Sequence, residues 1–158
     1  MQRYSKQEID RLRDFFRSKS YSEVTVELGS RKFSYFVLPQ ALEPKLLDFV
    51  FRCTGKPEDG YIFGISDKVR EDFRPYAVAH EVIEFTEIGI DRHNRCLTAL
   101  EQELSLVPDN LKREYIEMRH RFFRNLVVYA SGKPESFTPE DNAEFRQSLG
   151  RLEELVNH

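Results

Sequence analysis

The chain has 158 residues, of which 40% are hydrophobic and 32% are charged, and its net charge is −3. This length suits one ordinary domain, and the composition excludes a disordered chain. The negative charge argues against nucleic-acid binding, because domains that bind phosphates are normally basic. Thirteen phenylalanines and seven tyrosines, with no tryptophan, supply large apolar rings for a core.

The N-terminal part of the chain predicts a helix followed by a β-hairpin. Ser5 and Glu8 have the spacing of a capping box in front of an amphipathic run, so residues 5–19 should be helical. Residues 23–28 then alternate between polar and apolar, and a more apolar run covers residues 33–38. Turn residues separate these two runs, which therefore predict a hairpin.

The rest of the chain predicts one more strand and several helices. Pro44 favours a short helix over residues 45–53, and the apolar residues 61–66 predict a third strand. Four further helices are expected, over residues 75–88, 91–107, 108–131 and 138–156. We therefore predict one α+β domain over residues 1–158, with a small antiparallel sheet of about three strands packed with five or six helices. Residues 1–66 should hold the sheet, and residues 67–158 should be helical.

Several features bear on the compartment of the protein. No run of residues approaches the roughly 18 apolar residues of a membrane span, and the first residues lack the apolar core of a secretory signal. Cys53 and Cys96 are widely spaced and stand in no Cys-x-x-Cys context, which favours free thiols in a reducing compartment. We predict a cytoplasmic protein without a membrane segment.

The residues with the clearest chemical potential lie in the helix expected over residues 75–88. At about 100° per residue, His80, Glu84 and Glu87 share one polar stripe opposite the apolar face. Side chains spaced in this way lie one above another and can converge on one cation. Imidazole and carboxylate groups are ordinary ligands of Zn²⁺, and carboxylates also suit Mn²⁺ or Fe²⁺. The alternative is a solvated helix face that binds nothing.

Other polar groups give a less specific signal. No spacing singles out a further ligand among His93, Glu101 and Glu103. A basic stretch that contains Arg119 is interleaved with Phe122 and Phe123, a pattern that can bind nucleic acid. Glutamates in the same stretch can pair with its basic residues, so core aromatics beneath a salt-bridged outer face explain the pattern better.

The segment Ala79-His80-Glu81-x-x-Glu84, preceded by a short strand, resembles the helix of minimal zincin-type metallopeptidases. The resemblance covers roughly residues 60–90. It implies that His80 is a zinc ligand and that Glu81 is the general base that acts on a zinc-bound water. Glu84 stands where that family has its second histidine, so ordinary peptidase activity is not expected.

Two functions from different classes therefore remain. The first is a zincin-related protein that binds a divalent metal through His80, Glu84 and Glu87, with absent or atypical hydrolase activity and with Glu81 as the base if a reaction occurs. The second is a non-enzymatic module whose helical residues 91–157 offer an aromatic-rich face to a protein partner or to a second copy. Metal content and oligomeric state distinguish the two.

Overall fold

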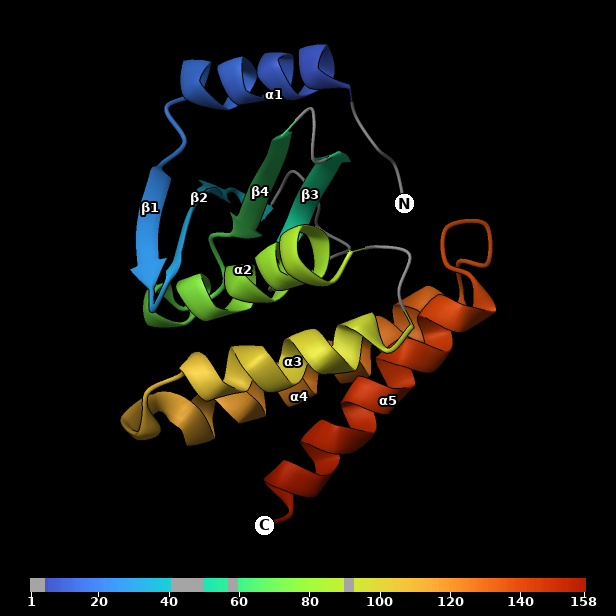
Figure 1. The fold of residues 1–158 in the computed structure, drawn as a ribbon. Coiled ribbons are helices and arrows are strands. Elements are labelled where there is room, and N and C mark those ends of the chain that lie inside the picture. Colours follow the sequence, from blue (N-terminus) through green and yellow to red (C-terminus); the bar gives the residue numbers. More distant parts are fainter. Residues whose placement is uncertain (1–4, 41–49, 57–59, 90–92) are drawn as a thin grey trace. The chain divides into compact units, whose positions relative to one another are not determined.

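The computed structural model describes residues 5–40, 50–56, 60–89 and 93–158, and the chain forms two compact units, residues 2–82 and 83–158. Together they contain a small sheet and, in the described part of the chain, five α-helices, which confirms the predicted α+β class (Figure 1). The grouping of both units into one domain stays a prediction. Among the described residues, no helix combines the length and the hydropathy that a bilayer span requires.

The sheet belongs to the first unit and is mixed. Strands β1 (Glu23–Leu28) and β2 (Arg31–Leu38) form the predicted antiparallel hairpin. Gly29 turns the chain between them with φ of +63°, a conformation that glycine adopts without steric cost. Strand β4 (Gly60–Ser66) lies parallel to β2, and β3 (Val50–Lys56) pairs antiparallel with β4, so the order within the described residues is β1-β2-β4-β3. The sheet thus has one strand more than expected and one parallel pair.

Strand β3 corrects the helix expected over residues 45–53. Residues 45–49 lie outside the described residues, but residues 50–53 are extended and pair with β4. Val50, Phe51 and Thr54 are residue types that favour strands, and a short apolar run does not distinguish a strand from a buried helix. Residues 50–53 form a strand because pairing with β4 provides hydrogen-bond partners for the backbones of β3 and β4.

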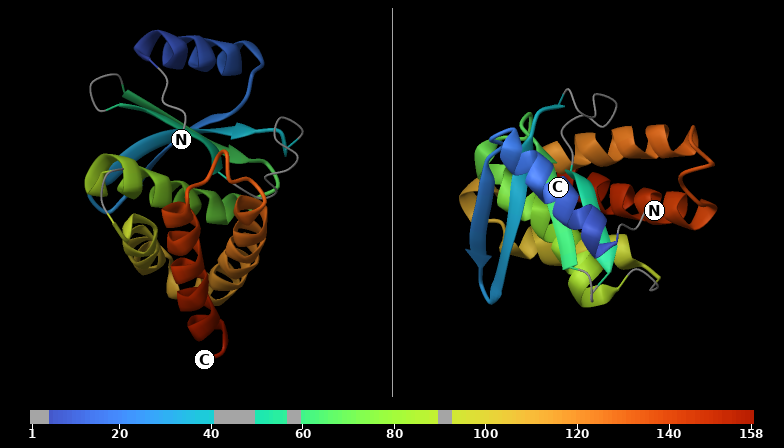
Figure 2. Two further views of the ribbon diagram at one scale, coloured as in Figure 1. Left: turned by 90° about the vertical axis from the view of Figure 1, so that its right-hand side faces the viewer. Right: turned by 90° about the horizontal axis from the view of Figure 1, so that it is seen from above.

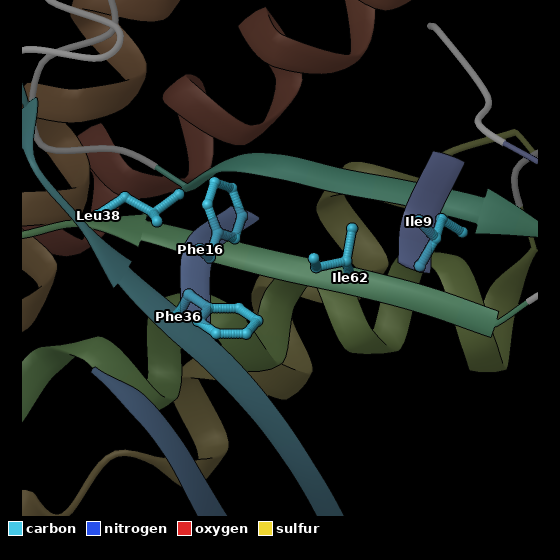
Figure 3. Packing of buried hydrophobic residues seen from close by; sticks show 5 residues of the cluster. All are labelled: Ile9, Phe16, Phe36, Leu38 and Ile62. Carbon is cyan, nitrogen blue, oxygen red and sulfur yellow. The ribbon is translucent and has the colours of Figure 1, made fainter. Parts of the chain in front are cut away.

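Helix α1 (Lys6–Ser18) covers one face of the sheet. It starts at the predicted capping box, in which Ser5 accepts from the Glu8 amide and Glu8 accepts from the Ser5 amide. Its residues Ile9 and Phe16 pack against strand residues of β2 and β4 in a cluster formed by Ile9, Phe16, Phe36, Leu38 and Ile62 (Figure 3). Burying such side chains contributes about 1.5–3 kcal/mol each, so this cluster anchors α1 to the sheet.

The helix predicted over residues 75–88 is present, but its second half has a different geometry. A 3-10 turn (Glu71–Phe73) leads into α2 (Arg74–Val82), and the helix continues without a break as a π-helical segment (Ile83–Ile88). Gly89, with φ of +91°, ends it, and the Gly89 amide donates to the Glu84 carbonyl at 2.9 Å. Wide π turns of this kind occur frequently at functional sites.

The second unit holds three helices: α3 (Arg95–Leu106), α4 (Asp109–Ser131) and α5 (Pro139–Val156). Helix α5 packs against both α4 and α3 (Figures 1 and 2). It begins as predicted, with Thr138 and Asp141 in a capping box and Pro139 in the first turn. The buried faces of α3 and α4 supply most of the apolar core of this unit, including Leu100, Tyr115, Phe122 and Phe123.

A buried ion pair lies inside this core, which corrects the outer-face position expected for Arg119. Arg119 is 4% exposed, and its Nε and Nη2 atoms lie 2.8 Å and 3.1 Å from the two carboxylate oxygens of Glu103. Tyr115 donates a hydrogen bond to the same carboxylate. Burial acts to lower the pKa of Arg119, but its electrostatic interactions with Glu103 and Tyr115 outweigh this effect, so the pKa lies above its ordinary value. Arg119 and Glu103 therefore form a charged pair, and loss of either residue would leave a buried charge without its partner.

Candidate metal centre

Three side chains with metal-ligating atoms come together from the end of α2, the π-helical segment and the start of α3. They are His80, Glu84 and Cys96, and their potential ligand atoms (one ring nitrogen, one carboxylate oxygen and the sulfur) all lie within 4.8 Å of one another. All three residues are buried, with exposed fractions of 3%, 7% and 4% in that order. Within the described residues this is the group whose geometry suits a metal ion.

His80 and Glu84 are brought together by one continuous helical segment. The boundary between the two compact units falls between Val82 and Ile83, but the helix does not break there. A step of four residues along a helix places two side chains on the same face. Because both residues are buried, the alternative of a solvated helix face does not apply to them.

Cys96 reaches the group from the first turn of α3. Asn94 precedes this helix with φ of +56° and makes no side-chain capping bond. Instead, Glu144 of α5 accepts from the Cys96 amide at 3.2 Å, and the hydroxyl of Ser148, one turn further along α5, donates to the Cys96 sulfur at 3.2 Å. Cys96 is a free thiol, as expected, whereas the side chain of Cys53 lies outside the described part of the structure. Two α5 side chains thus hold the backbone and the sulfur of Cys96.

The other two predicted site residues occupy different positions. Glu87 is exposed and lies outside the group, while Glu81 is half-buried and also lies outside it. Glu87 lies outside the group because of the π geometry. A helix with hydrogen bonds between residues i and i+5 turns less per residue than an α-helix. Glu87 therefore does not fall on the face that an ideal wheel assigns to it. The roles predicted for Glu81 and Glu87 stay predictions.

The other residues that the sequence offered as further ligands lie outside the group of His80, Glu84 and Cys96. Glu103 is committed to Arg119, and Glu101 pairs on the surface with Arg151 at 2.6 Å. His93 is exposed at the rim of an open hollow in front of α3, which is also lined by Asn94, Glu140, Glu144 and Arg146. Glu144, which lines this hollow, also accepts the hydrogen bond from the Cys96 amide. The open hollow therefore lies beside the start of α3.

A positively charged side chain lies beside Glu84. The Nε atom of Arg95, the first residue of α3, lies 3.4 Å from Oε1 of Glu84, and the two side chains are 13% and 9% exposed. Buried carboxylates are stable only when they are paired or bound to a metal. Arg95 is one such charge partner of Glu84.

The ligand types define what the group can bind. Histidine nitrogen, carboxylate oxygen and cysteine sulfur are the three kinds of ligand that zinc uses in proteins, at about 2.0–2.3 Å. Atoms that share one tetrahedral ion lie about 3.3–3.8 Å apart at these bond lengths, so pairs within 4.8 Å need only small side-chain movements. The sulfur could not be found from sequence by ligand spacing, because it lies on the next helix, beyond Gly89.

Comparisons with known proteins give no second line of evidence. No family model, no curated protein and no solved structure matches this chain.

Proposed function

We infer that the protein binds a divalent transition-metal ion through His80, Glu84 and Cys96. The observation that carries this proposal is the convergence of three buried ligand atoms of different chemistry within 4.8 Å. Polar groups are seldom buried together without a reason, since each loses its hydration. A bound cation compensates for that loss by accepting all three groups at once.

Zinc is the metal that this ligand set favours. Thiolate sulfur is a soft ligand that selects zinc, iron or copper over magnesium and calcium, and it makes manganese a poor choice. One carboxylate and one thiolate also neutralise a divalent ion, which suits a buried site. Three protein ligands leave the fourth tetrahedral position of zinc for water or a small ligand.

The proposed function is metal binding, and it does not include peptide hydrolysis. A peptidase of the zincin type needs a base that faces the metal-bound water, and the group that supports the metal proposal does not include Glu81. The ligand set also replaces the second histidine by Glu84 and adds a sulfur. A zincin-like origin of the helix stays a prediction, and a hydrolase reaction is not needed to explain the site.

Metal analysis of the purified full chain tests the proposal. We expect about one Zn²⁺ per chain in the wild type, a visible absorption spectrum after exchange for Co²⁺, and a near-ultraviolet sulfur-to-cobalt band, as four-coordinate thiolate sites require. His80→Ala and Cys96→Ser should lose the metal, whereas a variant at the exposed His93, His93→Ala, should keep it. A wild type that stays metal-free after loading, or a Cys96→Ser variant with an unchanged cobalt spectrum, contradicts the proposal.

Replacing Ser148 by alanine should weaken zinc binding about tenfold, because groups that hydrogen-bond to a ligand typically contribute 10–100-fold to metal affinity. The Ser148 hydroxyl is fully buried and donates to the Cys96 sulfur at 3.2 Å, which orients that sulfur toward the group. The affinity is measured by competition with a coloured chelator. Ser131→Ala is the matched control, because the Ser131 hydroxyl is exposed and donates to the Val128 carbonyl of its own helix. Equal affinities in the two variants would show that Ser148 has no part in the site.

The alternative of a helical interaction module gains no specific support. Of the aromatic residues of α4 that could form such a surface, Tyr115, Phe122 and Phe123 are buried, whereas Tyr129 is half-buried. The large hydrophobic residues that are exposed in the described part of the chain are Phe15, Val128 and Val156. Scattered apolar residues of this kind are normal on protein surfaces. A protein partner or self-association stays a prediction that light scattering can test.

A further inference from the structure

Helix α5 contributes no residue to the group of His80, Glu84 and Cys96, but two of its side chains contact Cys96. Oε1 of Glu144 accepts from the Cys96 amide at 3.2 Å, and the Ser148 hydroxyl donates to the Cys96 sulfur at 3.2 Å. Glu144 and Ser148 are four residues apart, so they lie one above the other on one face of α5. This face therefore contacts both the backbone and the ligand atom of Cys96.

The contact with Glu144 takes the place of a local cap at the start of α3. Cys96 is the second residue of this helix, and the first amides of a helix have no acceptor within the helix. The residue before a helix commonly supplies that acceptor, but Asn94 has a left-handed conformation and makes no side-chain capping bond. Glu144, 48 residues further along the chain, places a carboxylate at the positive end of the helix dipole. A neighbouring helix thus holds the first turn of α3.

A metal site is sensitive to the placement of the backbone that carries a ligand. The bond between zinc and sulfur is about 2.3 Å long, and ligand distances in a real site lie within about 0.2 Å of the ideal. A movement of the first turn of α3 moves the sulfur of Cys96 with it. Groups that orient a ligand typically change metal affinity by about 10–100-fold. Glu144 therefore acts on the ligand atom through the backbone, whereas Ser148 acts on it through the side chain.

We propose that Glu144 is a positioning residue of the metal site, and that it couples zinc binding to the packing of α5 on α3. This inference rests on the proposed metal function and adds a control of its affinity by a helix that carries no ligand. Helices α3 and α5 pack against each other. Coupling between two events is reciprocal, so an ion that fixes the Cys96 sulfur also favours the arrangement in which Glu144 contacts Cys96. Displacement of α5 should therefore weaken metal binding.

The test compares two variants of Glu144 with the wild type by chelator competition for Zn²⁺. Glu144→Ala removes the acceptor, so we expect about tenfold weaker binding, as for other residues that orient a ligand. Glutamine keeps an oxygen that can accept from the Cys96 amide, so Glu144→Gln should bind zinc within about threefold of the wild type. After exchange for Co²⁺, the sulfur-to-cobalt band should change in Glu144→Ala and not in Glu144→Gln. A loss of stability alone would leave the band of the folded, cobalt-saturated protein unchanged.

Glu140→Ala is the matched control, because Glu140 is an exposed acid one turn before Glu144 on α5 and lines the same hollow. Its zinc affinity should equal that of the wild type. Equal weakening in Glu140→Ala and Glu144→Ala would show that the negative charge of α5, and not the contact with Cys96, is the cause. Equal weakening in Glu144→Ala and Glu144→Gln would likewise overturn the positioning role.

Hydrogen exchange of the wild type measures the coupling without any substitution. Added zinc should slow the exchange of amides in residues 139–150 of α5 as well as in the first turn of α3, because local opening of either helix then requires loss of the ion. The protection of α5 should be smaller in Glu144→Ala. Zinc bound by the wild type without protection of α5 would overturn the coupling and leave the metal site in place. A wild type that binds no zinc would overturn the metal site itself.

Discussion

Replacing Glu103 by glutamine should lower the free energy of unfolding by about 3–5 kcal/mol, because breaking a buried ion pair leaves a charge without its partner. Glu103 is fully buried, and its carboxylate contacts Arg119 through two nitrogens and accepts from Tyr115. Glutamine has nearly the same shape, so packing is kept while the negative charge is lost. Urea unfolding followed by circular dichroism measures the change.

Two further variants separate the charge from its surroundings. The double replacement Glu103→Gln with Arg119→Met removes both charges and should recover much of the loss, since an apolar side chain in place of a buried ion is often tolerated. The surface pair provides the control: Glu101→Gln removes a carboxylate from Arg151 at an exposed position and should cost about 1 kcal/mol or less. A loss of similar size in Glu101→Gln and Glu103→Gln would show that burial does not set the energetics of the pair.

Saturating zinc should raise the free energy of unfolding of the wild type by about as much as Glu103→Gln lowers it. A ligand that binds only the folded state at about 1000 times its dissociation constant adds about 4 kcal/mol. For a chain of this size, that corresponds to roughly 8–16 °C in melting temperature. Cys96→Ala should abolish the increase, because removal of the sulfur leaves His80 and Glu84 as the remaining members of the group. Thermal melts with zinc and with a chelator measure the difference.

Magnesium and the variant His93→Ala are the controls for the stabilisation by zinc. Magnesium should produce no comparable shift in the wild type, since it demands oxygen ligands and does not bind thiolate. His93→Ala should respond to zinc as the wild type does, because His93 is exposed and lies outside the group. An equal zinc shift in Cys96→Ala and the wild type would place the zinc at another site.

Local signals in the sequence account for most of the fold. The capping boxes at Ser5 and Thr138 set the starts of α1 and α5, and Gly29 marks the hairpin turn. These features act over a few residues and can be read without the tertiary structure. The strand at Val50 was missed because its state is decided by pairing with β4, which is a non-local interaction.

The candidate site was predictable only where its residues share a helix. His80 and Glu84 could be paired from their spacing of four, and the structure brings them together. The geometry after Ile83 could not be anticipated, since a π turn has no simple sequence signature, and it leaves Glu87 exposed. Cys96 joins the group through tertiary packing that involves Glu144 and Ser148 of α5, and no local pattern reports such packing.

The order of strands in the sheet has a consequence for how the chain folds. Between the parallel strands β2 and β4, the chain first forms the edge strand β3 and only then returns to the position beside β2. Pairings of this kind form slowly, because the entropy of closing a long loop is lost before any contact rewards it, whereas helices joined by short connections form quickly. Residues 83–158 contain only helices in their described part. During refolding, Glu84 and Cys96 should therefore acquire their native surroundings before the central strands of the sheet are paired.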